Sequence, residues 1–196
     1  MTFLLIWYIY KMNADFYNLI AKSSGLRESR EEIRDFIFAN PSYLKDLTEI
    51  AFNTKDKNHH KACWILELIC QDQTTLFIPF TADFCTVLPY FKKDSAIRPA
   101  SKICLLIITS NYRKNENQLS ENQLQKITES CFDWLINNTK VASKCYSIRT
   151  LFQIGKQVDW IYPELQIILN KDYNAHSAAY KAVAREILKK INNQKK

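Results

Sequence analysis

Three residues with metal-binding side chains lie close together, at His59, His60 and Cys63. Imidazole nitrogens and thiolates are ligands that zinc prefers, and a helix would place His59 and Cys63 on one face. A zinc site needs three or four ligands, and the sequence places no fourth candidate beside these. The sequence favours the alternative, in which the two histidines are polar residues in the first turn of a helix. We therefore expect neither a metal site nor a cofactor.

Motifs of the common enzyme classes are absent from the sequence. No GxGxxG or GxxxxGK[ST] segment is present to bind nucleotide phosphates, and no GxSxG or HExxH segment occurs. His176 begins the final predicted helix without a paired nucleophile. The chain has only two glycines, fewer than phosphate-binding loops and all-β folds need. These features favour an all-α fold and lean toward a non-enzymatic function.

The excess positive charge of the chain lies in its C-terminal part. The formal net charge is +7; residues 1–139 carry 16 basic and 16 acidic residues, whereas residues 140–196 carry 11 and 4. A surface of this kind would suit an acidic protein segment or the phosphates of a nucleic acid. The alternative is a solvated lysine-rich face without a binding role. The candidate ligand-binding residues are Lys102, Lys144, Arg149, Lys181 and Arg185.

The elements that would position these side chains are helices, because apolar residues recur at helical spacing. Asn40-Pro41 is a favourable helix start, with asparagine as the cap and proline in the first turn. The polar run 55–58 interrupts the pattern and predicts a tight turn. A second helix then follows, with apolar residues spaced i, i+3, i+4 and i+7. Residues 40–69 therefore predict one antiparallel helical hairpin.

The second-helix pattern recurs three more times, with its first residue about 40 positions further along each time. A small residue at that anchor position would let two helices approach closely. The alternative is a non-repetitive bundle of amphipathic helices. The four segments are Ala62-x-x-Ile65-Leu66-x-x-Ile69, Ala100-x-x-Ile103-Cys104-x-x-Ile107, Cys145-x-x-Ile148-Arg149-x-x-Phe152 and Ala184-x-x-Ile187-Leu188-x-x-Ile191.

On these segments the chain resembles small HEAT-repeat proteins over about residues 40–192. The resemblance implies a right-handed α-solenoid of about four to five hairpins, a single domain over 12–192, and second helices that line a concave surface. HEAT families mostly imply binding scaffolds, so we expect an adaptor that presents a basic C-terminal concave surface to an acidic protein partner. Arg149 departs from the pattern in an apolar slot. It is expected to pair with Asp133 or Asp159, or to turn into the groove.

A second resemblance keeps an alternative function open. HEAT-like DNA glycosylases use tryptophans, an aspartate and an arginine on a basic concave surface, and this chain has Asp133, Trp134, Arg149 and Trp160. Their spacing follows no glycosylase motif, but nucleic-acid binding or DNA repair remains the alternative to the adaptor function. The Ser-rich, Gly-containing substrate loop of fumarase/aspartase-type lyases is absent.

The remaining segments carry weaker predictions. Residues 75–92 and 97–110 are expected to form the second hairpin, with Pro89 kinking or closing its first helix. Residues 111–122 predict a long polar loop, either a surface insert or a binding loop, followed by a helix capped at Ser120. The basic tail is expected at 193–196.

Residues 1–11 are apolar but too short to span a bilayer, and we expect a non-native or disordered extension. A short membrane-associating tail is the alternative reading of this segment, and we expect no stable membrane insertion. The six cysteines form no CxxC pair and lie mostly in apolar runs, which predicts reduced thiols in a cytoplasmic protein.

Overall fold

Helices make up all the secondary structure of the residues described by this computed structural model, which are 13–114 and 119–194. The expected all-α class is therefore confirmed for this part of the chain. The α-helices are α1 (Ala14–Lys22), α2 (Arg27–Ala39), α3 (Tyr43–Phe52), α4 (His59–Asp72), α5 (Thr81–Val87), α6 (Asp94–Lys114), α7 (Glu121–Ile136), α8 (Val141–Ile154), α9 (Ile161–Asp172) and α10 (Ala178–Gln194). Short 3-10 helices are η1 (Thr74–Phe80), η2 (Leu88–Tyr90) and η3 (Tyr173–Ala175).

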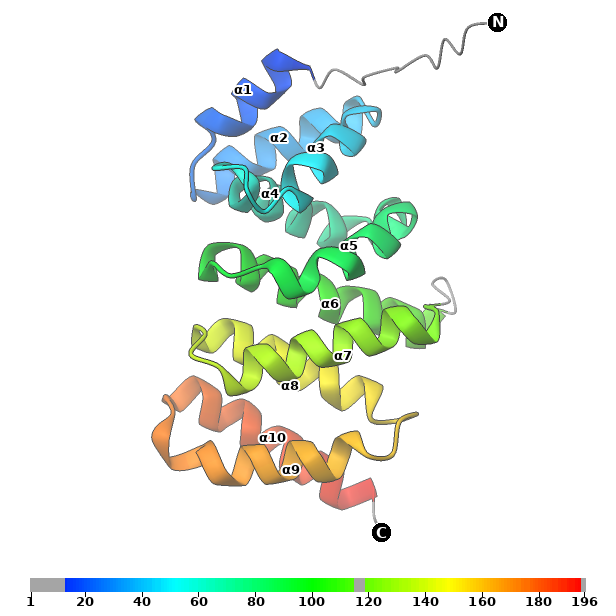
Figure 1. Cartoon of the computed structure of the whole chain (residues 1–196), viewed down its shortest axis with the longest axis vertical. Helices are drawn as coiled ribbons and strands as arrows, with labels where there is room; N and C mark the ends of the chain where they lie inside the picture. Colours follow the sequence, from blue (N-terminus) through cyan, green and yellow to red (C-terminus); the bar gives the residue numbers. More distant parts are fainter. Residues whose placement is uncertain (1–12, 115–118, 195–196) are drawn as a thin grey trace, which may run out of the picture.

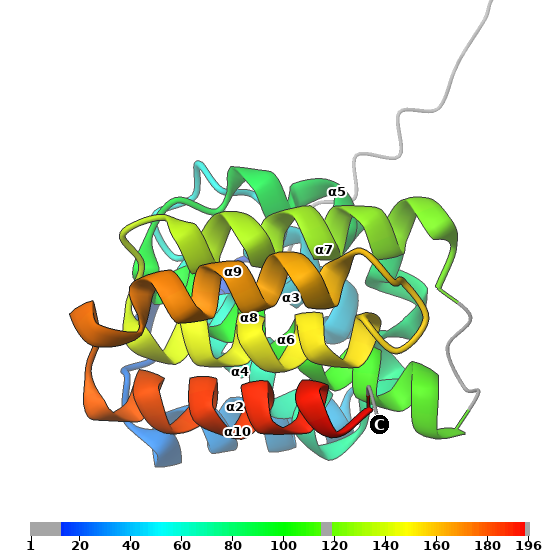
Figure 2. The same cartoon turned by 90° about the horizontal axis from the view of Figure 1, so that it is seen from below.

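Successive helices pair and follow one another along the longest axis, from α1 and α2 at one end to α9 and α10 at the other (Figure 1). The second helices α2, α4, α6, α8 and α10 form one layer, in which each packs on the next. The first helices α3, α5, α7 and α9 form the other layer, in front of it in Figure 1. Seen along the axis, α2 and α10 lie farther from the first helices than α4, α6 and α8 do (Figure 2). The second-helix layer is therefore curved.

Three of the four expected anchor residues are buried in this layer. Ala62, Ala100 and Ala184 have almost no exposed surface, whereas Cys145 is only partly buried. In α8 the buried residues with the same spacing are instead Lys144, Ser147, Ile148 and Leu151. The frame of the third unit is therefore one residue earlier than expected. Ile148 takes the slot assigned to Arg149, and a lysine takes the anchor position.

The helix expected at residues 75–92 is divided into three shorter pieces, η1, α5 and η2. Pro79 lies inside η1, and Pro89 lies in the first turn of η2, where a missing backbone N–H costs least. Phe77 and Phe84 are fully buried against each other, with ring centroids 5.3 Å apart. These two prolines break the helix while the aromatic residues hold its pieces against the core.

Two helix boundaries differ from expectation. Helix α6 continues to Lys114, so the expected loop at 111–122 is shorter, and Asn40 does not cap α3. The Asn40 side chain instead donates to the carbonyl of Phe36 at the end of α2, and α3 begins at Tyr43. The start of α7 is as expected: Ser120 and Gln123 form a capping box in which each side chain bonds the other's backbone N–H.

Helix α6 begins at Asp94 and runs through Pro99. The proline nitrogen carries no hydrogen, so it cannot donate to the carbonyl of Ser95 four residues earlier. The indole N–H of Trp64, in α4, donates to that carbonyl at 2.7 Å. A side chain of the preceding hairpin therefore replaces the hydrogen bond that the proline removes.

The connection between α8 and α9 depends on a close approach to Gly155. A Cβ atom at this position would lie 2.3 Å from a ring carbon of Tyr162, so the site accepts only glycine without rearrangement. The Tyr162 ring stacks on Phe152 with centroids 5.6 Å apart, and its hydroxyl donates to the Phe152 carbonyl at 3.1 Å. These contacts fix the start of α9 against the end of α8.

Some predictions concern residues outside this description. The expected extension at 1–11 lies outside the described residues, as do residues 195–196 of the expected basic tail, whose first two residues belong to α10. All six cysteines lie within the described part and are free thiols. Over the described residues, no helix has both the length and the apolar composition that a membrane span requires.

We expect Trp64→Phe to lower the free energy of unfolding by about 1–3 kcal/mol, because the Ser95 carbonyl would lose its donor while the aromatic ring remains. Pro99→Ala should remove most of that loss, since an alanine N–H can bond the same carbonyl within the helix. Chemical denaturation of both single variants and the double variant measures the coupling. An equal loss from Trp64→Phe in both backgrounds would show that the indole hydrogen bond does not compensate for the proline.

Candidate partner-binding site

The five basic residues proposed from the sequence do not converge on one surface. Lys144 is 5% exposed, and its ammonium group donates to the carbonyls of Leu135 and of Asn137, the latter at 2.7 Å. These carbonyls lie at the C-terminal end of α7, where a positive charge is favourable. Burial lowers the pKa of the Lys144 amine. Lys144 is therefore a helix cap inside the protein, not part of an open basic groove.

Arg149 makes an ion pair, which was one of its two predicted roles, but its partner is not one of the predicted carboxylates. Its guanidinium lies 2.9 Å from the carboxylate of Glu186 in α10, so the expected partners Asp133 and Asp159 were wrong. Lys190 bonds the same carboxylate at 2.7 Å. The hydrogen bond from Lys190, followed by the charge of Arg149, lowers the pKa of Glu186. The pairing joins α8 to α10 and balances part of the local charge.

Lys102 also takes part in contacts between helices. Its ammonium group donates to Glu67 at 3.0 Å and to Gln71 at 2.6 Å, both in α4. The Glu67 carboxylate is 3% exposed and also pairs with Arg98, at 3.1 Å. A buried carboxylate needs such partners, because leaving it unpaired would cost several kcal/mol. Lys102 and Arg98 therefore stabilise the α4–α6 contact.

Lys181 and Arg185 are the two candidates that the fold brings together. Both approach Tyr173, in the connection between α9 and α10: Lys181 lies 5.9 Å from the ring centroid, and Arg185 donates to the hydroxyl at 3.1 Å. Arg185, Lys189, Leu188 and Tyr173 line a depression of about 560 Å³ together with Asn170, Asn192 and Asn193. We call this surface the C-terminal depression. It lies between α9 and α10, so it is not confined to the second-helix layer.

Arg185 is the one residue of this lining that the sequence-based candidate set contained; the other six, among them Tyr173 and Lys189, were not in it. Lys181, Arg185 and Lys189 follow each other at helical i, i+4, i+8 spacing, and that signal was available. The position of Tyr173 was not available, because it depends on how the connection between two helices turns.

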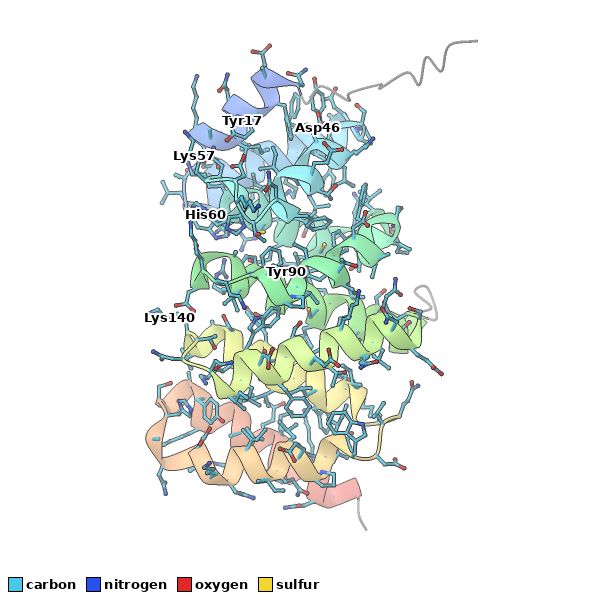
Figure 3. The ribbon with its side chains drawn as sticks, viewed as in Figure 1. Tyr17, Asp46, Lys57, His60, Tyr90 and Lys140 are labelled. Atoms are coloured by element: carbon cyan, nitrogen blue, oxygen red, sulfur yellow. The ribbon has the colours of Figure 1, made fainter. Side chains whose placement is uncertain are left out.

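The cluster of His59, His60 and Cys63, where the sequence predicted no zinc site, makes contacts with the surrounding protein. The Cys63 thiol donates to the Ala51 carbonyl at 3.6 Å, and His59 stacks on Phe91 with centroids 6.1 Å apart. Across residues 13–114 and 119–194, no group of three or more potential ligands is placed to hold a metal ion. His59 is 2% exposed, and its ring centroid lies 6.0 Å from that of His60, which is labelled in Figure 3.

The four residues compared with HEAT-like glycosylases are divided between two parts of the fold. Trp134 is buried, and Arg149 pairs with Glu186 in the second-helix layer. Asp133 and Trp160 line a different cavity of about 750 Å³ beside α7. The four residues compared for the alternative function are therefore not gathered on one surface of the described structure.

We expect Lys144→Met to lower the free energy of unfolding by about 1–3 kcal/mol, because it leaves two carbonyls at the end of α7 without their donor. Lys140, labelled in Figure 3, is the matched control, because it is exposed at the start of the same helix. Lys140→Met should change stability by under about 0.5 kcal/mol. Equal denaturation midpoints for the two variants would contradict the capping role.

The stability of the protein should fall as the pH decreases from about 7 to 5. Burial lowers the pKa of both His59 and His60; the charges of His60 and Lys93 lower that of His59 further, and the charge of Lys93 also lowers that of His60. The Nδ1 atoms of both are buried without a hydrogen-bond partner. The unfolded chain, with histidine pKa about 6.5, therefore binds protons that the folded state binds only at lower pH. The free energy of unfolding should consequently decrease below about pH 6.5.

Replacing both histidines in a His59→Phe, His60→Gln variant should make the free energy of unfolding less dependent on pH, because neither new side chain titrates. Denaturation midpoints at a series of pH values measure it. A slope between pH 7 and 5 as steep in the double variant as in the unaltered protein would exclude the histidine pair as its cause.

Comparison with known protein families, curated proteins and solved structures finds no match to this chain. The resemblance to HEAT-repeat proteins therefore stays a prediction from the spacing of residues in the sequence.

Proposed function

We propose that the protein is a non-enzymatic, HEAT-like adaptor in which a right-handed α-solenoid presents a basic C-terminal surface to an acidic protein segment. The repeated anchor spacing and the packing of each second helix on the next support the solenoid. Stacked hairpins bury their apolar faces on one another and offer extended surfaces for partners. The curved second-helix layer in Figure 2 is consistent with that architecture.

The C-terminal depression is the observation that supports an acidic peptide as the proposed ligand. Arg185 and Lys189 supply positive charge, Asn170 and Asn192 supply amide donors, and Leu188 and Tyr173 supply apolar surface. Its described lining residues include no carboxylate. Arginine bonds carboxylates with two parallel N–H groups, and the lysines add charge without fixed geometry. A peptide with Asp or Glu beside an apolar residue fits this combination.

The proposed surface is smaller than the groove expected from the sequence. Lys144 is buried and Lys102 and Arg149 are paired with carboxylates, so they contribute little to an open site. Lys181 and Arg185 remain from the original set, and Lys189 joins them. The proposed site is therefore confined to the last hairpin, at the C-terminal end of the stack, and does not extend along the C-terminal half of the second-helix layer.

Charge reversal tests the proposal with a labelled 12-residue peptide of Glu and Leu. Arg185→Glu with Lys189→Glu, both in the lining of the depression, should weaken binding by at least about tenfold, which corresponds to 1.4 kcal/mol. Lys55→Glu with Lys57→Glu changes the net charge equally, at exposed residues of the opposite half, and should change affinity by less than about twofold. Figure 3 labels Lys57 near the N-terminal end. Fluorescence anisotropy measures both, and equal losses would exclude the depression.

A single-stranded oligonucleotide in the same assay tests the nucleic-acid alternative. Its affinity should fall steeply with salt if the phosphates dominate binding, because bound counterions are released. If the oligonucleotide binds more tightly than the acidic peptide and shows that salt dependence, the result would exclude the adaptor function in favour of nucleic-acid binding.

A further inference from the structure

A second cavity lies in the first-helix layer, beside α7 and the residues that lead into α9. We call it the α7 pocket; it measures about 750 Å³. Helix α7 packs on α8, and α9 packs on α8 and α10, so α7 and α9 leave space between them. Both helices lie in the front layer of Figure 1. The pocket is therefore separate from the C-terminal depression.

An aromatic pair forms the apolar part of the α7 pocket. Trp160 stacks on Phe132 with ring centroids 5.6 Å apart and planes inclined by 22°. Trp160 is nevertheless 57% exposed, and its indole N–H makes no hydrogen bond to any other described residue. Leu124 and Val158 extend the apolar lining. An exposed tryptophan with a free donor, held on an aromatic support, is typical of the residues that dominate protein interfaces.

The charged residues of the pocket are all acidic. Glu121, Glu129 and Asp133 lie on α7, and no lysine or arginine is among the described lining residues. The carboxylates of Glu121 and Asp133 form no ion pair with described residues, and Glu129 accepts a hydrogen bond only from Gln125, at 2.8 Å. In a chain of net charge +7, this surface has the opposite sign to the whole. It therefore complements a positively charged ligand.

The length of the pocket favours a peptide as that ligand. The lining residues of α7 run from Glu121 to Asp133, which is about 18 Å of helix at 1.5 Å per residue. A lining this long matches an extended or helical segment of several residues. Compact cationic molecules would contact only part of it.

We propose that the α7 pocket binds a basic segment of a partner protein that inserts an apolar or aromatic side chain beside Trp160. The inserted side chain contacts the Trp160 and Phe132 rings, and neighbouring lysines or arginines pair with Glu121, Glu129 and Asp133. This inference does not depend on the function of the C-terminal depression, because the two surfaces share no residue and have opposite charge. An adaptor with both could hold an acidic and a basic segment at once.

Binding of two labelled 14-residue peptides tests the proposal by fluorescence anisotropy. One contains lysine and leucine with a central phenylalanine, and the other has glutamate in place of every lysine. The lysine peptide should bind, and Trp160→Ala should weaken it by at least about tenfold. Glu129→Gln with Asp133→Asn should weaken it by at least about fivefold and reduce its salt dependence, because the attraction is between charges.

Matched controls lie outside the pocket. Tyr90 is 64% exposed on η2 and is labelled in Figure 3, and Glu28 and Glu32 are exposed on α2. Tyr90→Ala, and Glu28→Gln with Glu32→Gln, should each change affinity by less than about twofold. Thermal denaturation of each variant confirms that it is folded. The proposal is overturned if the glutamate peptide binds as tightly as the lysine peptide, or if folded Trp160→Ala binds normally. Losses in the control variants equal to those in the pocket variants would also overturn it.

Discussion

Close packing between successive second helices is the interaction on which the rest of the structure depends. Ala62, Ala100 and Ala184 are buried in these helices, and small side chains of this kind let neighbouring helices approach closely. Each helical hairpin has two apolar faces and can cover only one of them alone. The order of the stack therefore follows from the need of each hairpin to bury its second face on a neighbour.

Charged side chains in the same layer mainly serve this packing. Glu67 is buried between α4 and α6 and is neutralised by Arg98 and Lys102, while Arg149 and Glu186 join α8 to α10. A count of basic residues along the chain consequently overestimates the charge that a partner meets. Two of the surfaces that remain available are the basic C-terminal depression and the acidic α7 pocket, which lie in different parts of the fold.

The periodic apolar pattern was enough to predict the helical class, the hairpins and three of the four anchors. It failed in α8, because Lys144 has an apolar stem long enough to be buried while its ammonium group reaches the end of α7. A residue that is buried by its stem and satisfied by distant carbonyls has no signature in a pattern of apolar letters. Because the buried positions of α8 lie one residue earlier than predicted, Arg149 was wrongly assigned to an apolar position.

The candidate site was less predictable than the fold. The charge asymmetry indicated the C-terminal end of the chain, and Lys181 and Arg185 lie together there beside Tyr173. The partners of Lys102 and Arg149 depended on long side chains that cross between helices, and a linear sequence does not order those contacts. The aromatic stacking of Phe132 and Trp160 similarly joins residues on two elements whose spacing is set only by the folded connection.

The contact between Gly155 and Tyr162 has a consequence for the entropy of binding. The Tyr162 ring occupies the space that a Cβ atom at residue 155 would need, and its hydroxyl is hydrogen-bonded to the Phe152 carbonyl. The chain that leads into α9 is therefore ordered when the protein folds. Trp160 lies within that ordered connection, so its backbone loses little further freedom when a partner arrives. Preorganisation of this kind reduces the free-energy cost of association. The affinity of the α7 pocket would then be limited chiefly by the flexibility of the segment that enters it.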